Sequence, residues 1–192
     1  MINIGIIIAS TRKERVGERV GRWVCEKASK RKGWKTELVD LQKWPLPFLD
    51  FPIEKTEKKA IDELSKKWSE KINSLDGFIV VTPEYNHGYN AALKNAIDYL
   101  YGEWEKKPVS FVSYGGASGG ARSVEQLKQV FAEFEAVIVS EAVLIQFVRD
   151  AFNHDGSLKD DERRSKQADK MLDSLIWWAE LLKKARQNAP PV

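Results

Sequence analysis

Five short segments, four of them apolar, separated by longer amphipathic segments, constrain the fold more than any other feature of this sequence. Most of them are rich in Ile, Val or Phe, as expected for strands buried on both faces of a sheet. The segments between them carry apolar residues in steps of three and four, which is typical of helices packed on a sheet. The predicted strands are 2–9, 35–40, 77–81, 108–114 and 136–144. The predicted helices are 18–31, 57–73 with Thr56 as its cap, 91–104, 124–134 and 160–186.

This alternation of strands and helices predicts an α/β fold in three layers, with a parallel sheet between two layers of helices. Right-handed crossovers leave two common strand orders for such a chain, and five strands fit the order 2-1-3-4-5. The 192 residues are enough for one domain with a full core and short for two. We therefore expect a single domain over residues 1–192.

The charge balance and the cysteine content exclude several classes of protein. Lys and Arg number 31 and Asp and Glu 28, so the net charge of +3 is too small to indicate nucleic acid. Cys25 is the only cysteine, so an intrachain disulfide and a cysteine cluster for a metal are impossible, and we find no other metal set. The apolar N-terminal run is too short for a membrane span and follows no basic region. A cytoplasmic protein without a membrane partner is the default expectation.

The predicted strand order brings three loops together at the carboxyl edge of the sheet, where open α/β sheets bind ligands. The first, residues 10–17, offers the hydroxyls of Ser10 and Thr11, the cations Arg12 and Arg15, and backbone N–H groups at a helix N-terminus. Together these predict an anion site. The alternative is a solvated basic turn, which is our interpretation of Lys13 and Glu14.

The other two loops follow the third and fourth strands. Pro83 ends a strand because it has no N–H to donate, residues 84–88 form a turn, and Asn90 can cap the next helix. Four glycines within 115–120 indicate a backbone that approaches a flat ligand closely, or alternatively a tight loop before a helix. Neither a Walker A sequence nor G-x-G-x-x-G is present, so ATP and a Rossmann dinucleotide site are not indicated.

Three further features have two interpretations each. Cys25 and Arg31 have the C-x5-R spacing of cysteine phosphatases, but they lie within a predicted helix, so we interpret the match as chance. His87 lies in a turn and either contacts a substrate or is simply exposed. Residues 44–51 combine prolines with Trp44, Phe48 and Phe51, and such a rigid apolar loop packs either on the core or on a partner.

The three ligand loops together resemble those of the NAD(P)H-dependent FMN reductase family, which has the flavodoxin-like fold. The matching motifs are A-S-T-R at 9–12, P-E-Y-N-H-G-Y-N-A-A-L-K-N-A-I-D at 83–98 and S-Y-G-G-A-S-G at 113–119. The resemblance extends to about residue 144. Two positions depart from the family pattern, because Ala9 replaces the usual glycine and Asn90 the usual proline.

The resemblance implies noncovalent FMN, with its phosphate in the first loop and its ring against the other two. The phosphate would contact Ser10, Thr11, Arg12, Arg15, Val16 and Gly17, in part through their backbone N–H groups. The ring would lie against Pro83, Glu84, Tyr85 and Asn86, with Ser113, Gly115 and Gly116 on the neighbouring side. No side chain need act as an acid or base, so no catalytic residue is named.

The implied activity is hydride transfer from NADPH or NADH to N5 of FMN, and then reduction of a small-molecule acceptor such as a quinone, an azo compound, free flavin or a metal ion. The resemblance also implies a homodimer or homotetramer, with 91–104 as a candidate interface. One alternative is an FMN electron carrier without NAD(P)H turnover, although the charge of +3 argues against it. Another is a flavin-loaded redox sensor that binds a partner through the loop 44–51.

Overall fold

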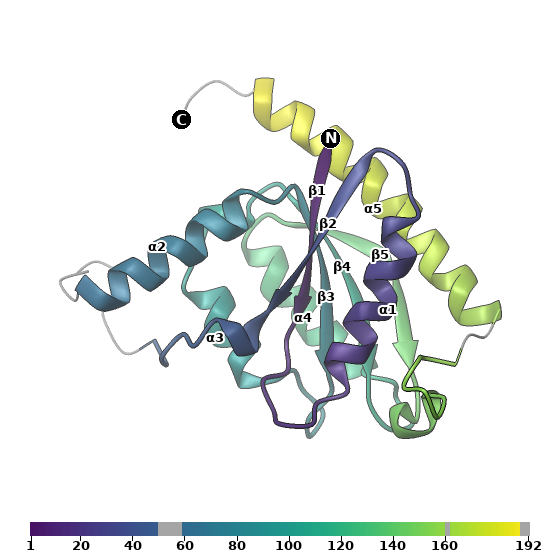
Figure 1. Cartoon of the computed structure of the whole chain (residues 1–192). Coiled ribbons are helices and arrows are strands. Elements are labelled where there is room, and N and C mark those ends of the chain that lie inside the picture. Colours follow the sequence, from purple (N-terminus) through teal and green to yellow (C-terminus); the bar gives the residue numbers. More distant parts are fainter. Residues whose placement is uncertain (50–58, 160–161, 189–192) are drawn as a thin grey trace.

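A five-stranded parallel sheet forms the centre of the molecule (Figure 1). The computed structural model describes residues 1–49, 59–159 and 162–188, with the side chains of 59–62 excepted. The strands follow the order β2-β1-β3-β4-β5, which confirms the predicted topology and the flavodoxin-like fold class. They are β1 (Ile2–Ile8), β2 (Trp34–Asp40), β3 (Gly77–Pro83), β4 (Pro108–Tyr114) and β5 (Val137–Ile145).

Five α-helices and three short 3-10 helices connect and cover the strands. The α-helices are α1 (Gly17–Ser29), α2 (Lys59–Asn73), α3 (Ala91–Asp98), α4 (Ala121–Glu133) and α5 (Glu162–Asn188). The 3-10 helices are η1 (Leu41–Lys43), η2 (Gly102–Trp104) and η3 (Val148–Ala151). The predicted helix 91–104 is wrong in its second half, because α3 ends at Asp98 and the chain turns so that the Trp104 Nε1 donates to the Ile97 carbonyl at 3.2 Å. The predicted cap Thr56, and Phe51 of the apolar loop, lie outside the described residues.

Side chains that alternate along each strand build two cores, one on each face of the sheet. On one face, Ile4 and Ile6 of β1 pack with α1 and α5, whose buried residues include Trp23 and Leu175. On the other face, Ile7 packs with residues of α2, α3 and α4. Figure 1 shows the same division of helices. Both faces of β3 and β4 are therefore buried, as their continuous apolar sequences predict.

The strand register aligns the carboxyl ends of four strands and so positions the candidate site. Ile8 of β1 pairs with Val81 of β3, Pro83 with Tyr114 of β4, and Tyr114 with Ile145 of β5. The loops that follow these strands consequently start at one edge of the sheet. The β3 ladder runs through Pro83, two residues beyond the predicted strand end, and the Glu84 N–H still donates to the Tyr114 carbonyl at 3.0 Å.

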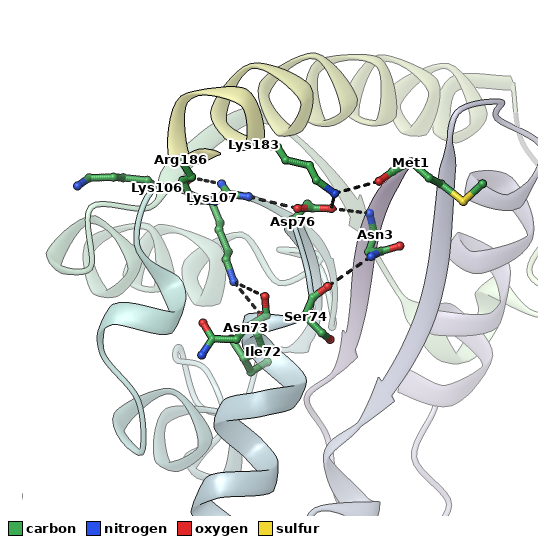
Figure 2. Close-up of polar contacts among 10 residues, drawn as sticks. All are labelled: Met1, Asn3, Ile72, Asn73, Ser74, Asp76, Lys106, Lys107, Lys183 and Arg186. Atoms are coloured by element: carbon green, nitrogen blue, oxygen red, sulfur yellow. Dashed lines mark hydrogen bonds and ion pairs between the residues drawn. The ribbon is translucent and has the colours of Figure 1, made fainter. Parts of the chain in front are cut away.

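The opposite, amino edge of the sheet is held by the buried carboxylate of Asp76 (Figure 2). One of its oxygens accepts from the Asn3 N–H at 2.9 Å and from the Lys183 Nζ at 2.8 Å. The other accepts from the Arg186 Nη2 at 3.3 Å. Lys183 also donates to the Met1 carbonyl at 3.0 Å. This network fastens the end of α5 to the start of β1.

A second buried charge, Lys107, lies close to this network in Figure 2 and secures the end of α2. Its Nζ donates to the carbonyls of Ile72 at 2.9 Å and Asn73 at 3.4 Å, two of the acceptors that a helix leaves unpaired at its C-terminus. Burial, together with the nearby Arg186, lowers the pKa of Lys107 to about 8 despite the opposing effect of Asp76.

Candidate functional site

A cavity of about 600 Å³ opens at the carboxyl edge of the sheet. Its walls come from the loops after β1, β3, β4 and β5. The lining residues are Arg12, Lys13, Glu14, Arg15, Val16, Pro83, Glu84, Tyr85, Tyr114, Gly115, Gly116, Phe147, Val148, Arg149 and Asp150. The cavity therefore collects the three loops that the sequence predicts to converge, together with a fourth.

The loop after β1 carries a buried arginine with spare hydrogen-bonding capacity. The Arg15 side chain is 5% exposed, and its Nη2 pairs with the Asp40 carboxylate at 2.5 Å. Its Nε and Nη1 are buried and have no partner within the described part of the chain. Unpaired buried donors are costly, so this guanidinium has unused donors for an anion bound at the loop.

Tyr114, at the end of β4, reaches under the same loop to the start of α1. A Cβ atom added to Gly17 would lie 2.5 Å from the Tyr114 hydroxyl, so only glycine fits between this ring and the helix. The hydroxyl is buried and has no partner among the described residues. Burial, and secondarily the neighbouring Tyr85, raises the pKa of Tyr114, so the phenol stays protonated and remains a donor.

Tyr85 connects the loop after β3 to the loop after β1. Its hydroxyl forms a 2.8 Å hydrogen bond with the buried Ser10 hydroxyl, and the Arg12 guanidinium lies 5.4 Å from the centre of its ring. The hairpin turn that carries Tyr85 places Asn86 and His87 at positive φ, and Tyr85 and Gly88 exchange backbone hydrogen bonds at 2.9 and 3.1 Å. The predicted turn at 84–88 is confirmed.

Glu84 lines the cavity, and its carboxylate binds Arg122 of α4. The carboxylate accepts hydrogen bonds from the Ser118 hydroxyl at 2.9 Å, the Arg122 N–H at 3.1 Å and the Arg122 Nε at 2.6 Å. Burial alone raises the pKa of Glu84, but these hydrogen bonds outweigh it and lower the pKa below its usual value. Glu84 is consequently a charged residue that ties the loop after β3 to the glycine loop.

The glycine loop is held rigidly from behind and is open toward the cavity. Gly120 has a φ of +92°, and an added Cβ would lie 2.6 Å from the Ser113 Cβ. The Ser113 hydroxyl is buried and donates to the Gly119 carbonyl at 2.9 Å, so Ser113 supports the loop rather than lining the cavity. By contrast, an added Cβ at Gly116 would meet nothing within 4 Å. A flat ligand can therefore approach the backbone at Gly116.

The fourth wall, residues 147–150 after β5, is absent from the predicted site. The Phe147 N–H donates to the Gly116 carbonyl at 3.0 Å and the Val148 N–H to the Gly115 carbonyl at 3.1 Å, so this segment is joined to the glycine loop. A signal was available in the sequence, because an aromatic residue and an arginine lie within five residues of the end of a predicted strand whose carboxyl end is at the same edge.

The structure distributes the other predicted site residues around the cavity. Arg12, Arg15, Val16, Pro83, Glu84, Tyr85, Gly115 and Gly116 line it. Ser10, Gly17 and Ser113 are buried immediately behind its walls. Thr11 instead lines two smaller hollows beside Leu46, and Asn86 is exposed in the hairpin turn. Their roles toward a cofactor remain predictions.

Asn90 occupies the N-cap position of α3, but the predicted side-chain cap is wrong. No helix N–H bonds to its side chain. Instead its Nδ2 donates to the carbonyl of Ala9 at 2.8 Å, and its Oδ1 is buried without a partner among the described residues. Asn90, which replaces the usual proline of the family, thus ties the start of α3 to the end of β1. Its partner Ala9 is the other position that departs from the family pattern.

The apolar loop after η1 packs on the core at one end and is exposed at the other. Trp44 packs against Trp68 with ring centres 5.1 Å apart, whereas Phe48 is 75% exposed. Asn95 of α3 holds the loop on both sides of Phe48, donating to the Pro47 carbonyl at 2.8 Å and accepting from the Leu49 N–H at 3.0 Å. His87 and His154 are both exposed, and Cys25 lies within α1, as its sequence context predicts.

The residues present fit FMN. The loop at 10–17 combines a helix N-terminus, the cation Arg12 and the unpaired donors of Arg15, which suit a phosphate. The open backbone at Gly116 and the wall at Pro83 suit a planar ring. No group of three or more His, Cys, Asp and Glu side chains that could hold a metal occurs in the described ranges.

A parallel sheet in this order, with a cavity at its carboxyl edge, defines a protein of the flavodoxin-like fold class. The chain belongs to the family of NADPH-dependent FMN reductases, whose family model matches residues 2–150. The resemblance inferred from the three motifs is confirmed. At the level of the family, this also confirms the prediction of an oxidoreductase that uses FMN and NAD(P)H.

Individual relatives agree with this assignment. An NAD(P)H-dependent FMN reductase of Schizosaccharomyces pombe is 43% identical over 132 residues, which cover 65% of this chain and 63% of that protein, a little under two thirds of its length. A quinone reductase of Pseudomonas putida is 30% identical over 93% of this chain and 95% of its own. Among solved structures, the flavoenzyme NAD(P)H:(acceptor) oxidoreductase FerB of Paracoccus denitrificans has a TM-score of 0.74 at 26% identity, covering 94% of this chain and 98% of its own.

None of the helices in the described ranges is long and apolar enough to cross a membrane.

Proposed function

We propose that this protein is an NAD(P)H-dependent oxidoreductase that holds FMN in the cavity at the carboxyl edge of the sheet and reduces a small-molecule acceptor there. The observation that carries the proposal is the pairing of an anion-binding loop at 10–17 with the open glycine backbone at Gly116 in one cavity. Membership of the FMN reductase family supports it.

In this proposal the residues of the chain bind and orient FMN, and none acts as an acid or base. Arg12 and Arg15 neutralise the phosphate, and the Ser10–Tyr85 hydrogen bond fixes the phosphate loop relative to the wall that supports the ring. Glu84, through Ser118 and Arg122, holds the glycine loop at a fixed distance from that wall. FMN, when bound, supplies two-electron chemistry by accepting hydride from NAD(P)H and reducing the acceptor.

We further propose a quinone as the acceptor class. The basis is similarity, because several relatives are named quinone reductases, including the one from Pseudomonas putida. Azo compounds, free flavin and metal ions are the alternatives, and comparison of kcat/KM for each class with the same purified protein distinguishes them.

The visible spectrum of the purified protein, followed anaerobically as NADPH is added, tests the proposal. Flavin absorbance that bleaches promptly is the expected result. A flavin spectrum that neither NADPH nor NADH changes would favour an electron carrier or a redox sensor instead. A colourless protein that takes up no added FMN would contradict the cavity assignment altogether.

We also propose a cytoplasmic homodimer or homotetramer, in which the exposed Phe48 and the outer surface of α3 form a contact. Phe48 is 75% exposed, although hydrogen bonds from Asn95 fix the loop around it. The loop therefore holds the exposed ring in a defined position, as a contact surface requires. Light scattering tests this assembly. Phe48→Glu is expected to lower the measured mass, while Lys159→Glu, a charge change on an exposed residue elsewhere, is expected to leave it unchanged.

A further inference from the structure

The segment after β5, residues 147–150, forms a wall of the cavity that the proposed FMN contacts do not use. The strand order explains its position. The loops of β3 and β4 occupy the middle of the carboxyl edge, with the loop of β1 on one side and that of β5 on the other. The cations Arg12 and Arg15 therefore belong to one flank of the cavity, and Arg149 belongs to the other.

Phe147 combines an unfavourable backbone with an exposed ring. Its φ of +44° and ψ of +51° lie in the left-handed region, which a residue with a large side chain rarely adopts. Hydrogen bonds hold it there, from its own N–H to the Gly116 carbonyl at 3.0 Å and from the Asp150 N–H to its carbonyl at 2.9 Å. The ring is nevertheless 59% exposed, so no core packing compensates for the strain. Strain of this kind that the surrounding structure maintains is a mark of functional segments.

Arg149 supplies a positive charge on the same wall, two residues after Phe147. It is exposed, and no hydrogen bond or ion pair to its guanidinium occurs among the described residues. Among the other charged residues on the walls, Arg12 and Arg15 are assigned to the proposed FMN phosphate, and Glu84 pairs with Arg122. An exposed arginine and an exposed aromatic ring on one wall are a combination suited to a nucleotide, because one binds phosphate and the other stacks on a base.

We propose that residues 147–150 bind the adenosine half of NAD(P)H, with Arg149 pairing with phosphate oxygens and the Phe147 ring packing against the adenine. This inference rests on the proposed function. The flank at 10–17 is assigned to the FMN phosphate, so a second phosphate site on the far flank requires a second phosphate-bearing ligand. A quinone or an azo compound carries no phosphate, whereas the pyridine nucleotide does.

The test is calorimetric titration of the purified protein with adenosine 2′,5′-bisphosphate, a probe that has phosphates and adenine but no nicotinamide. Arg149→Gln is expected to weaken binding about tenfold or more, as for loss of a charged hydrogen bond. Phe147→Gly, which suits the left-handed backbone and removes only the ring, is expected to weaken it about fivefold or more. Phe147→Tyr, which keeps a ring, is expected to bind as the wild type does.

Lys13→Gln is the matched control, because Lys13 is an exposed cation on the opposite flank of the same cavity. It is expected to change probe affinity less than about twofold, as for a screened surface charge. In steady-state assays, Arg149→Gln is expected to raise the KM for NADPH while kcat at saturation and the FMN dissociation constant stay at their wild-type values.

Three results would overturn the assignment. Equal losses of probe affinity in Lys13→Gln and Arg149→Gln would mean that the overall positive charge of the cavity, and not a specific site at 147–150, binds the probe. A parallel loss of FMN affinity would make 147–150 a support for the flavin. If the wild type does not bind the probe but NADPH still bleaches its flavin absorbance, the adenosine binds elsewhere. The proposed function would then remain intact. Conversely, the probe could bind in a manner that depends on Arg149 while NADPH leaves the flavin absorbance unchanged. That result would support this site and refute the proposed reductase function.

Discussion

Replacing Gly116 by Leu is expected to abolish flavin binding while leaving the fold intact. An added Cβ at Gly116 meets nothing within 4 Å, the residue is exposed, and its φ lies outside the left-handed region, so leucine introduces neither a clash nor backbone strain. The free energy of unfolding should therefore change by no more than about 0.5 kcal/mol, as for other surface substitutions. The new side chain would occupy the space where a ring would approach the backbone, so we expect FMN affinity to fall at least about 100-fold, or ~3 kcal/mol.

Gly120→Ala is the matched substitution in the same loop, with the opposite expectation for stability. Its Cβ would lie 2.6 Å from the Ser113 Cβ and 2.8 Å from the Tyr114 backbone nitrogen, and its φ is +92°. Left-handed strain of about 1–2 kcal/mol and overpacking of about 1–3 kcal/mol together predict a loss of roughly 2–5 kcal/mol. Urea unfolding and flavin fluorescence titration measure the two quantities for both variants. Wild-type FMN affinity in Gly116→Leu would refute the assignment of the ring to this backbone.

Three further predictions concern binding, loop attachment and pH. Arg12→Ala is expected to weaken FMN binding by about 1.5–3 kcal/mol, the range for a hydrogen bond to a charged group, and an unchanged titration would contradict the phosphate assignment. Asn90→Ala should lower the free energy of unfolding by about 1 kcal/mol, because the Ala9 carbonyl loses its donor, and urea unfolding would detect it. Burial lowers the pKa of Lys107 to about 8. Between pH 8 and the unfolded pKa near 10.4 the unfolded chain binds the extra proton, so the contribution of Lys107 to the unfolding free energy rises with pH, by up to about 3 kcal/mol. Urea unfolding at pH 7.5 and 10 should show this rise in the wild type and not in Lys107→Met, and parallel curves would count against it.

The architecture was predictable because it depends on patterns that repeat over many residues. The isoleucines of β1 and the apolar runs of β3 and β4 fix strands buried on both faces, and the chain then has few topologies available. Errors occurred where one contact decides the local structure. The helix 91–104 was predicted too long because the periodicity continues past Asp98, whereas the tertiary contact of Trp104 with Ile97 sets the turn.

The candidate site was predictable where a whole loop defines it and not where individual side chains choose among partners. Arg15 was predicted from its position in the loop, but its pairing with Asp40 of β2 joins residues of two separate elements. Asn90 shows the same limit, because a capping residue and a residue that bonds to Ala9 look identical in the sequence. The wall at 147–150 was missed because no motif marks it, although the rule for carboxyl ends of strands applied to β5 as well.

The network around Asp76 separates the part of the molecule that provides stability from the part that binds. Its hydrogen bonds close the amino edge of the sheet and join residues as distant in sequence as Asn3 and Arg186 (Figure 2). The cavity and its loops lie at the other edge, where Asn86, His87 and Phe147 adopt positive φ, although Lys106 and Glu135 at the amino edge do so as well. Variation in those loops can thus alter ligand preference at a modest risk of unfolding, and engineering for heat resistance can act at Asp76 and Lys107, which do not line the cavity.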